Sequence, residues 1–136
     1  QGKVITQDHN KAVMLWQKGA EQGHSDCQTK LGIAFSDGEG VAQDYKEAVK
    51  WFKKAAEQGN PGGQMLLGLA FYEGKGVTQD YAEAYFWQNL AVSQNSDYAG
   101  FRNKTAAKLS SSEIEDIQTR CKRWQENLEK KKALSH

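Results

Sequence analysis

The chain has 136 residues, 38% of them hydrophobic, which is enough for one domain of ordinary size. Its net charge of +1, with both signs mixed along the chain, argues against a nucleic-acid or anionic-membrane surface. No apolar run approaches the roughly 20 residues of a membrane helix, and two cysteines are too few for a disulfide framework. No signal peptide is recognisable, but a processed chain would look the same. The compartment therefore stays open, with a periplasmic or secreted location slightly favoured over a cytoplasmic one.

Three segments of the chain resemble one another at a fixed spacing. Residues 8–23, 44–59 and 80–95 each begin with Asp and carry small and aromatic residues at helical spacing. The offset is 36 residues in both steps (44 − 8 and 80 − 44). A fixed period of this length predicts a solenoid of stacked units. We therefore predict an all-α fold, an α/α superhelix (solenoid) of paired antiparallel helices with a C-terminal capping helix.

The period divides a single repeat domain, 1–136, into a half repeat and three further units: 8–23, 24–59, 60–95 and a degenerate C-terminal capping repeat, 96–131. Residues 2–7 match the tail of a glycine loop. The first helix, at about 8–22, is therefore expected to be the second helix of a unit whose first helix is missing.

Each full repeat is expected to contain a helix A, a glycine loop and a helix B. Helix A of the second repeat is predicted to start with Asn60 as the cap and Pro61 at the first helical position. Gly32 and Gly68 recur in the middle of helix A, where glycine costs about 1 kcal/mol relative to alanine. We expect each to permit a close helix crossing that a Cβ would block.

The two loops, 38–41 and 74–77, read Gly-x-Gly-Val. The first glycine of each is expected to end helix A in the left-handed conformation. The alternative is a phosphate cradle, but no strand precedes, no Gly-x-Gly-x-x-Gly is completed, and no Lys–Ser/Thr follows. The loops are therefore interpreted as structural.

Helix B is predicted to begin at Asp44 and at Asp80, each followed three residues later by Glu in a pattern that resembles a capping box. Alanines and aromatic residues follow at helical spacing. Alanines let helices approach, and aromatic rings fill the space beside them. Trp51 and Trp87 are therefore expected in the seam between helices rather than in a ligand box.

From Ser96 onward the repeat pattern decays. Asn95 is expected to end its helix in the left-handed conformation. Ser112, followed three residues later by Glu115, is expected to cap a last helix at about 112–131 whose apolar residues share one face. A terminal unit with one apolar and one polar face is typical of a solenoid cap.

The spelling Leu-Gly-x-Ala-Phe-x-x-Gly-x-Gly-Val-x-Gln-Asp-Tyr-x-Glu-Ala, followed by Trp-Phe-Lys-Lys-Ala-Ala-Glu-Gln-Gly, resembles the Sel-one-like repeat family. This family is a relative of the tetratricopeptide repeat, with paired antiparallel helices stacked in a superhelix. The resemblance is close over residues 5–95 and loose over 96–131. It implies a bacterial-type, non-catalytic adaptor or scaffold for protein–protein contacts, with no cofactor.

A cysteine-rich branch of the family, linked to β-lactam binding or hydrolysis, is the alternative. In this chain Cys27 stands where Gly63 and Ala99 stand in later repeats, and Cys121 lies in the apolar stripe of the last helix. We expect both thiols to be free and largely buried, in units too far apart to bridge. No Ser-x-x-Lys occurs, and Lys-Thr-Ala at 104–106 lacks the glycine of Lys-Thr-Gly, so a serine β-lactamase is not supported.

The histidines are scattered along the chain. Residues 24–27, His-Ser-Asp-Cys, could be read as a metal pocket, but side chains on one helical turn point in different directions and no second cluster exists. We expect no metal site and no catalytic residues.

In related paired-helix repeats helix A lines the concave surface, so a stripe of helix A residues is expected to face a groove. Large apolar side chains gather there in the second repeat and the cap, beside residues that could orient a polar segment. We expect a protein or peptide partner, with no nucleic acid and no membrane insertion, to contact Ile33, Met65, Leu69, Tyr72, Glu73, Phe101 and Arg102. The alternative is that the apolar members are packed under the next repeat.

The N-terminal end is expected to be open. The helix at 8–22 lacks its own helix A, which leaves one side of Val13, Leu15 and Trp16 without a partner in its unit. A bare solenoid end exposes apolar surface. We expect this end either to associate with another copy or to stack on upstream repeats.

Overall fold

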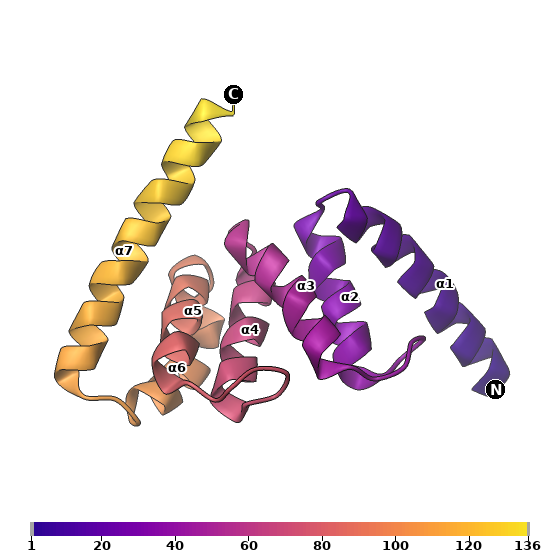
Figure 1. The fold of residues 1–136 in the computed structure, drawn as a ribbon, viewed down its shortest axis with the longest axis horizontal. Helices are drawn as coiled ribbons and strands as arrows, with labels where there is room; N and C mark the ends of the chain where they lie inside the picture. Colours follow the sequence, from indigo (N-terminus) through magenta and orange to yellow (C-terminus); the bar gives the residue numbers. More distant parts are fainter. Residues whose placement is uncertain (1, 136) are drawn as a thin grey trace.

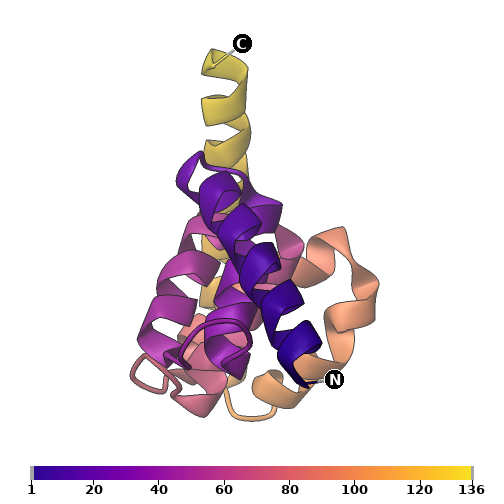
Figure 2. The same cartoon turned by 90° about the vertical axis from the view of Figure 1, so that its right-hand side faces the viewer.

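The computed structural model describes the backbone of residues 2–135 and the side chains from Asp8 onward. All regular structure in this range is helical, as predicted. The elements are α1 (Gly2–Glu21), α2 (Ser25–Asp37), α3 (Tyr45–Glu57), α4 (Pro61–Glu73), α5 (Tyr81–Gln94), the 3-10 helix η1 (Ser96–Tyr98), α6 (Ala99–Ala106) and α7 (Ser111–Leu134). The helices follow one another across the molecule from α1 at one end to α7 at the other (Figure 1). Figure 2 looks along this stack from the α1 end.

The first helix is longer than predicted. α1 begins at Gly2, so residues 2–7, which were expected to be the tail of a loop, continue the helix. In the full repeats the equivalent loop residues fold against the helix A that precedes them. No helix A precedes α1 among the described residues, and adding residues to an existing helix is far easier than nucleating one.

The predicted helix ends are confirmed at several positions. Asp44 and Asp80 cap α3 and α5 through their side chains, and Asn60 caps α4. Gly38 and Gly74 end α2 and α4 with φ angles of 72° and 70°, in the left-handed region that glycine adopts without strain.

Two predicted helix ends are wrong. α7 is capped by Ser110, not Ser112: the Ser110 hydroxyl accepts from the Glu113 N–H at 3.1 Å, and the Glu113 carboxylate accepts from the Ser110 N–H at 3.0 Å. Hydrogen bonds to the Glu113 carboxylate, first from the Ser110 backbone N–H and then from the Ser110 side chain, lower the pKa of Glu113. The serine run offers two matching triplets, and the earlier one makes both reciprocal bonds. Asn95 is extended, with φ −147°, because its side chain accepts from the Asp97 N–H and starts η1 instead.

The mid-helix glycines allow close helix crossings, as predicted. A Cβ on Gly32 would lie 2.5 Å from the Phe52 ring, and one on Gly68 would lie 2.7 Å from Gln88 Cγ and 3.0 Å from the Ala84 carbonyl oxygen. Helices A and B of each repeat therefore touch through backbone at this level.

The second glycine of each loop has a function that the sequence pattern did not reveal. Gly40 and Gly76 have φ angles of 78° and 80° and lie against the backbone carbonyls of His9 in α1 and Tyr45 at the start of α3, respectively, each in the preceding helix B. A side chain there would collide with that backbone. Each loop thus packs its repeat onto the one before it.

The core is a seam that runs between the helices. Leu31 and Trp51 are buried with Val13 near the N-terminal end, and Phe86 and Ile117 are buried near the C-terminal end. Burial of Val13 corrects the expectation that it lacks a partner. Trp16 is partly buried, and of the three residues expected to lack a partner only Leu15 is left exposed.

α7 closes the C-terminal end. The rings of Trp87 and Trp124 meet edge to face at 5.8 Å between centroids, and Arg120 pairs with Glu83 at 2.6 Å. α7 then continues well past α5 (Figure 1). Near its end a Leu128 methyl lies 3.0 Å from where a Cβ of Gly59 would be, in the turn between α3 and α4.

The two cysteines are free, as predicted. Cys121 is buried on α7, where its thiol donates to the Phe86 carbonyl at 3.4 Å. Cys27 packs beside Gly19 of α1 and is only half-buried, so the expectation that both thiols are largely buried is confirmed for Cys121 and not for Cys27. No helix in the described range is long and apolar enough to cross a bilayer.

Candidate functional site

A first cavity of about 100 Å³ lies between α1 and α2. It is lined by His9, Trp16, Lys30, Ile33, Ala34 and Glu39. Ile33, one of the residues predicted to contact a partner, is exposed here. His9 and Glu39 approach to 3.9 Å, so this cavity has a charged rim.

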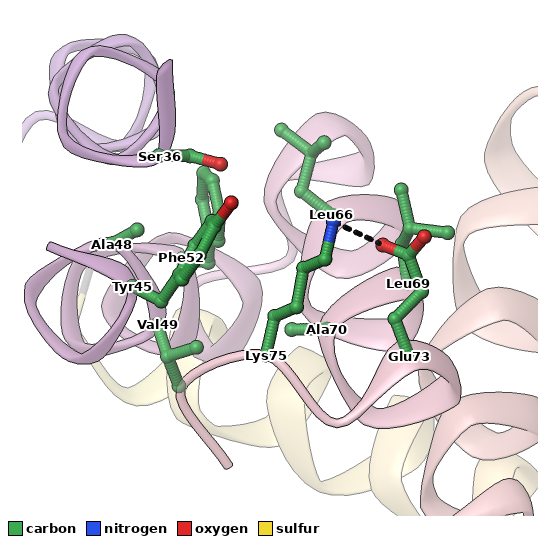
Figure 3. A pocket seen from close by; sticks show the side chains of 10 residues that line it. All are labelled: Ser36, Tyr45, Ala48, Val49, Phe52, Leu66, Leu69, Ala70, Glu73 and Lys75. Atoms are coloured by element: carbon green, nitrogen blue, oxygen red, sulfur yellow. Dashed lines mark ion pairs between the residues drawn. The ribbon is translucent and has the colours of Figure 1, made fainter. Parts of the chain in front are cut away.

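A second cavity, of about 50 Å³, lies one repeat further along (Figure 3). It is lined by Ser36, Tyr45, Ala48, Val49, Phe52, Leu66, Leu69, Ala70, Glu73 and Lys75. Adding 36 to the six residues of the first cavity gives Tyr45, Phe52, Leu66, Leu69, Ala70 and Lys75, all of which line the second. The cavity is therefore a feature of the repeat. On its rim Lys75 lies 4.0 Å from Glu73, and its ammonium stands 5.5 Å from the centre of the Tyr45 ring.

A third cavity, of about 130 Å³, lies between α4, α5 and α6. It is lined by Leu69, Tyr72, Glu73, Gln88, Phe101, Lys104 and Thr105. Four of the residues predicted to contact a partner therefore come together here: Leu69, Tyr72, Glu73 and Phe101. Phe101 is 48% exposed, an unusual state for a phenylalanine, and Tyr72 meets Tyr81 edge to face at 5.3 Å.

The floor of the third cavity is polar, unlike the other two. Gln88 occupies the repeat position of Trp16 and Phe52, and Thr105 occupies the position of Ile33 and Leu69. Both floor residues are buried and lie 2.6 Å apart, between Thr105 Oγ1 and Gln88 Oε1. An aromatic and an aliphatic side chain have thus been replaced together by a hydrogen-bonded pair.

This pair leaves a donor free. The single hydroxyl proton of Thr105 can be given either to Gln88 or to the Phe101 carbonyl, which lies 3.1 Å away. In the first case both amide N–H groups of Gln88 stay unpaired. In the second the amide turns over and gives one N–H to Thr105. In both cases Gln88, which is 1% exposed, keeps at least one N–H without a hydrogen-bond partner within residues 8–135.

Lys104 is a second residue of the third cavity that departs from the repeat pattern. It stands at the position of Gly32 and Gly68, where a Cβ would block the helix crossing. The cap therefore does not make this close crossing, and the Lys104 side chain lines the third cavity instead. Neither Gln88 nor Lys104 was among the predicted contacts, although a break in an otherwise strict repeat was the available signal.

Two predicted contact residues lie elsewhere. Met65 is buried, because α4 packs against α2, α3 and α5 and little of its N-terminal half reaches the surface. Arg102 lines none of the three cavities. Its guanidinium donates to Asn89 and Asn103 at 3.3–3.4 Å, which turns it towards α5.

No group of three or more His, Cys, Asp or Glu side chains that could hold a metal ion is found within the described range. Both cysteines are free, whereas resemblance to the cysteine-rich, β-lactam-linked branch would imply a disulfide in each repeat. The candidate site therefore consists of a row of three cavities, the exposed Phe101 ring, and the Gln88 and Lys104 donors at the third cavity.

A stack of antiparallel helix pairs with a cavity repeated along it defines an α/α solenoid. The Sel1 repeat matches residues 1–24, 25–60 and 61–96, and the chain belongs to the Sel1 repeat family. Members of this family are typically protein-interaction scaffolds, and the fold is generally non-enzymatic. No match is found among curated proteins.

Solved structures agree with this assignment. The chain is similar, with a TM-score of 0.82 and 35% identity over 87% of its length, to a protective antigen with an SLR fold from uropathogenic Escherichia coli strains. It is also similar, with a TM-score of 0.65 and 33% identity over 68% of its length, to a Sel1 repeat protein from Oxalobacter formigenes. The matches span 26% and 39% of those chains, so the chain corresponds to a part of each.

Proposed function

We propose that this chain is a non-catalytic adaptor that holds a segment of a protein or peptide across the row of cavities, on the concave, helix A side of the solenoid. The observation that carries this proposal is the third cavity, where Leu69, Tyr72 and Phe101 form apolar walls beside the charged Glu73 and Lys104. Exposed aromatic anchors next to adaptable polar groups are typical of interface hot spots.

The spacing of the cavities suits an extended segment. Helices A of successive repeats contact one another, as α2 and α4 do, so equivalent cavities are about one helix spacing apart, roughly 8–10 Å. A chain extended at about 3.3 Å per residue covers that distance in roughly three residues. A segment of about seven residues therefore reaches all three cavities, with apolar side chains at intervals of about three.

The test is capture of a partner with the wild-type chain, followed by titration of that partner against Tyr72→Ala, Leu69→Ala and Phe101→Ala. Each is expected to weaken binding by about 2 kcal/mol if the cavity is a hot spot. Loss of the Tyr72–Tyr81 contact should reduce stability by only about 1 kcal/mol. Leu134→Ala is the matched control, because Leu134 is exposed at the far end of α7.

Unchanged affinity in all three variants, with folding intact, would place the binding surface elsewhere on the solenoid. A large loss of stability in Leu69→Ala and Tyr72→Ala would show instead that these residues belong to the seam. Turnover of a chromogenic β-lactam by the pure protein would contradict the non-catalytic assignment.

A further inference from the structure

We propose that the segment bound at the third cavity is acidic: it presents one bulky apolar side chain to the cavity and at least two Asp or Glu side chains to α6. This inference rests on the proposed function, because it names the chemistry of the segment that the adaptor holds. It follows from three independent features of the cavity and its surroundings.

The first feature is a change of charge along the helices A. α2 contains Lys30 against two aspartates, a net charge of 1 − 2 = −1, and α4 contains Glu73 alone, also −1. α6 contains Arg102 and Lys104 and no acid, a net charge of +2, and Lys108 follows. No Asp or Glu occurs between residues 99 and 112. In a protein of net charge +1, positive charge is thus concentrated beside the third cavity.

The second feature is that these cations are unpaired. Lys75 and Arg120 each have a carboxylate within 4.0 Å, but no carboxylate of the described residues comes that close to Lys104 or Lys108. Lys104 lines the cavity, and the Lys108 ammonium lies 5.9 Å from the centre of the Tyr81 ring, next to Tyr72. Complementary charge steers a partner and fixes how it lies.

The third feature is the unpaired N–H of Gln88 at the cavity floor. The Gln88 nitrogen is not fully enclosed, since among the described residues only Trp51 Nε1 is a fully buried side-chain atom without a partner, so a bound group that accepts from Gln88 replaces water there. Gln88 and Lys104 line the same cavity and both donate. A carboxylate oxygen satisfies both, and charge-assisted hydrogen bonds are the stronger kind.

The walls explain why a bulky apolar side chain accompanies the carboxylates. Leu69, Tyr72 and Phe101 surround about 130 Å³, comparable with the roughly 150 Å³ apolar cavity that accepts benzene in an engineered protein. Glu73 sets the orientation. It stands on the side of the second cavity, where Lys75 lies 4.0 Å away, so the carboxylates of the segment lie on the opposite side, over α6.

The experiment uses the whole chain and defined peptides that are acetylated and amidated at their ends, so that every carboxylate is a side chain. The probe is Gly-Asp-Glu-Phe-Glu-Asp-Gly with a fluorescent label. Its controls are the amide version, Gly-Asn-Gln-Phe-Gln-Asn-Gly, and the version with Ala in place of Phe. Both controls are expected to bind about tenfold more weakly in fluorescence anisotropy.

The protein variants test the location. Lys104→Glu with Lys108→Glu is expected to weaken binding of the probe by about tenfold or more. Lys122→Glu with Lys130→Glu makes the same change of charge on the exposed surface of α7 and is expected to stay within about twofold. Binding is also expected to weaken between about 0.05 M and about 0.5 M NaCl, because salt screens exposed charges.

Each other outcome overturns the inference in a recognisable way. If the acidic and amide peptides bind equally and Tyr72→Ala weakens binding of both, the segment need not be acidic. The proposed function is then still supported. Loss in Lys104→Glu with Lys108→Glu but not in Tyr72→Ala, Leu69→Ala and Phe101→Ala shows that the cavity is not used, and contradicts both. No binding of the acidic probe, equal loss in the α7 control, or tighter binding of an oligothymidylate at the same salt also overturns it.

Discussion

Gln58, directly after the end of α3, donates a 2.7 Å hydrogen bond to the side-chain oxygen of Gln28 on α2. Gln28 in turn donates to the carbonyl of Ala20 in α1 at 3.1 Å. One period later, Gln94 donates to Gln64 at 2.9 Å, and Gln64 donates to a carbonyl near the end of α3 at 3.3 Å. Each buried glutamine thus joins its own helix B to the helix B of the preceding unit, across the seam.

The first prediction concerns this ladder. Gln64→Ala should reduce the free energy of unfolding by about 2–4 kcal/mol, because it removes the hydrogen bonds to the Ala56 carbonyl and from the Gln94 amide and opens a cavity at a fully buried position. Gln118→Ala, at an exposed position on α7, should change it by less than about 0.5 kcal/mol. Urea denaturation followed by circular dichroism measures both. Similar small effects in the two variants would show that the ladder contributes little.

The second prediction compares two glycines. Gly76→Ala should destabilise the chain by about 2 kcal/mol or more, because φ is 80° and the new Cβ meets the Tyr45 carbonyl. Gly100→Ala should stabilise it by about 0.5–1 kcal/mol, because Gly100 is helical and a Cβ there meets nothing within 4 Å. The midpoint of thermal unfolding should fall in Gly76→Ala and rise in Gly100→Ala. Shifts of the same sign would contradict the packing of the Gly76 loop on α3.

The third prediction concerns the thiols. Burial raises the pKa of Cys121, against smaller opposing effects of Asn89 and Arg120. The native protein should therefore show one thiol that reacts readily, Cys27, and one that reacts slowly, with two titratable in denaturant without reductant. An absence of thiols in denaturant would reveal a disulfide.

The raised pKa also gives a pH dependence. The folded state holds the Cys121 proton more tightly than the unfolded chain does, so its contribution to stability is intact below the ordinary thiol pKa of about 8.5. That contribution is lost as pH rises through the raised value. Wild type should lose stability above about pH 8.5 relative to Cys121→Ala, and parallel pH profiles would contradict this assignment.

The fourth prediction concerns the outer face of α1, where we propose that a second copy binds. Leu15 is 69% exposed, whereas Trp51 and Trp87, at the same repeat position, are 4% and 7% exposed behind their own helices A. Leu15 and the neighbouring Met14 border an open depression of about 620 Å³. A surface of this kind favours association.

Light scattering over a concentration series should show self-association of the wild type that Leu15→Glu abolishes. Leu134→Glu is the control, since it makes the same change at another exposed leucine, at the other end of the molecule. A monomeric mass at all concentrations, or equal loss in both variants, would contradict the proposal.

Sequence reasoning was most successful where the period carried the information. The helix pairs, the close crossing at Gly32 and the left-handed helix end at Gly38 each occur again 36 residues later. Each recurrence supports the structural interpretation of the first occurrence. Sequence reasoning failed where the period ends. Ser110 and Ser112 both match a capping pattern, and the reciprocal hydrogen bonds between Ser110 and Glu113 show which of them caps α7.

The candidate site was predicted in part. The face of helix A was identified well enough to bring Leu69, Tyr72 and Phe101 to one cavity. Met65 was misplaced, because helical spacing gives the direction of a side chain but not how many neighbouring helices cover it. The recurring pattern does not point to Gln88, because the floor of the third cavity is formed by residues that depart from the repeat.

The length of α7 affects how the solenoid unfolds. In a solenoid whose units touch only their neighbours, melting can start at an end and proceed one unit at a time, as in a one-dimensional Ising chain. Here Leu128 of the cap lies against Gly59, in the turn that precedes the last full repeat. The terminal helix therefore cannot fray along its length without loosening the turn in front of α4, three α-helices upstream, which favours unfolding of α4 to α7 as one cooperative block.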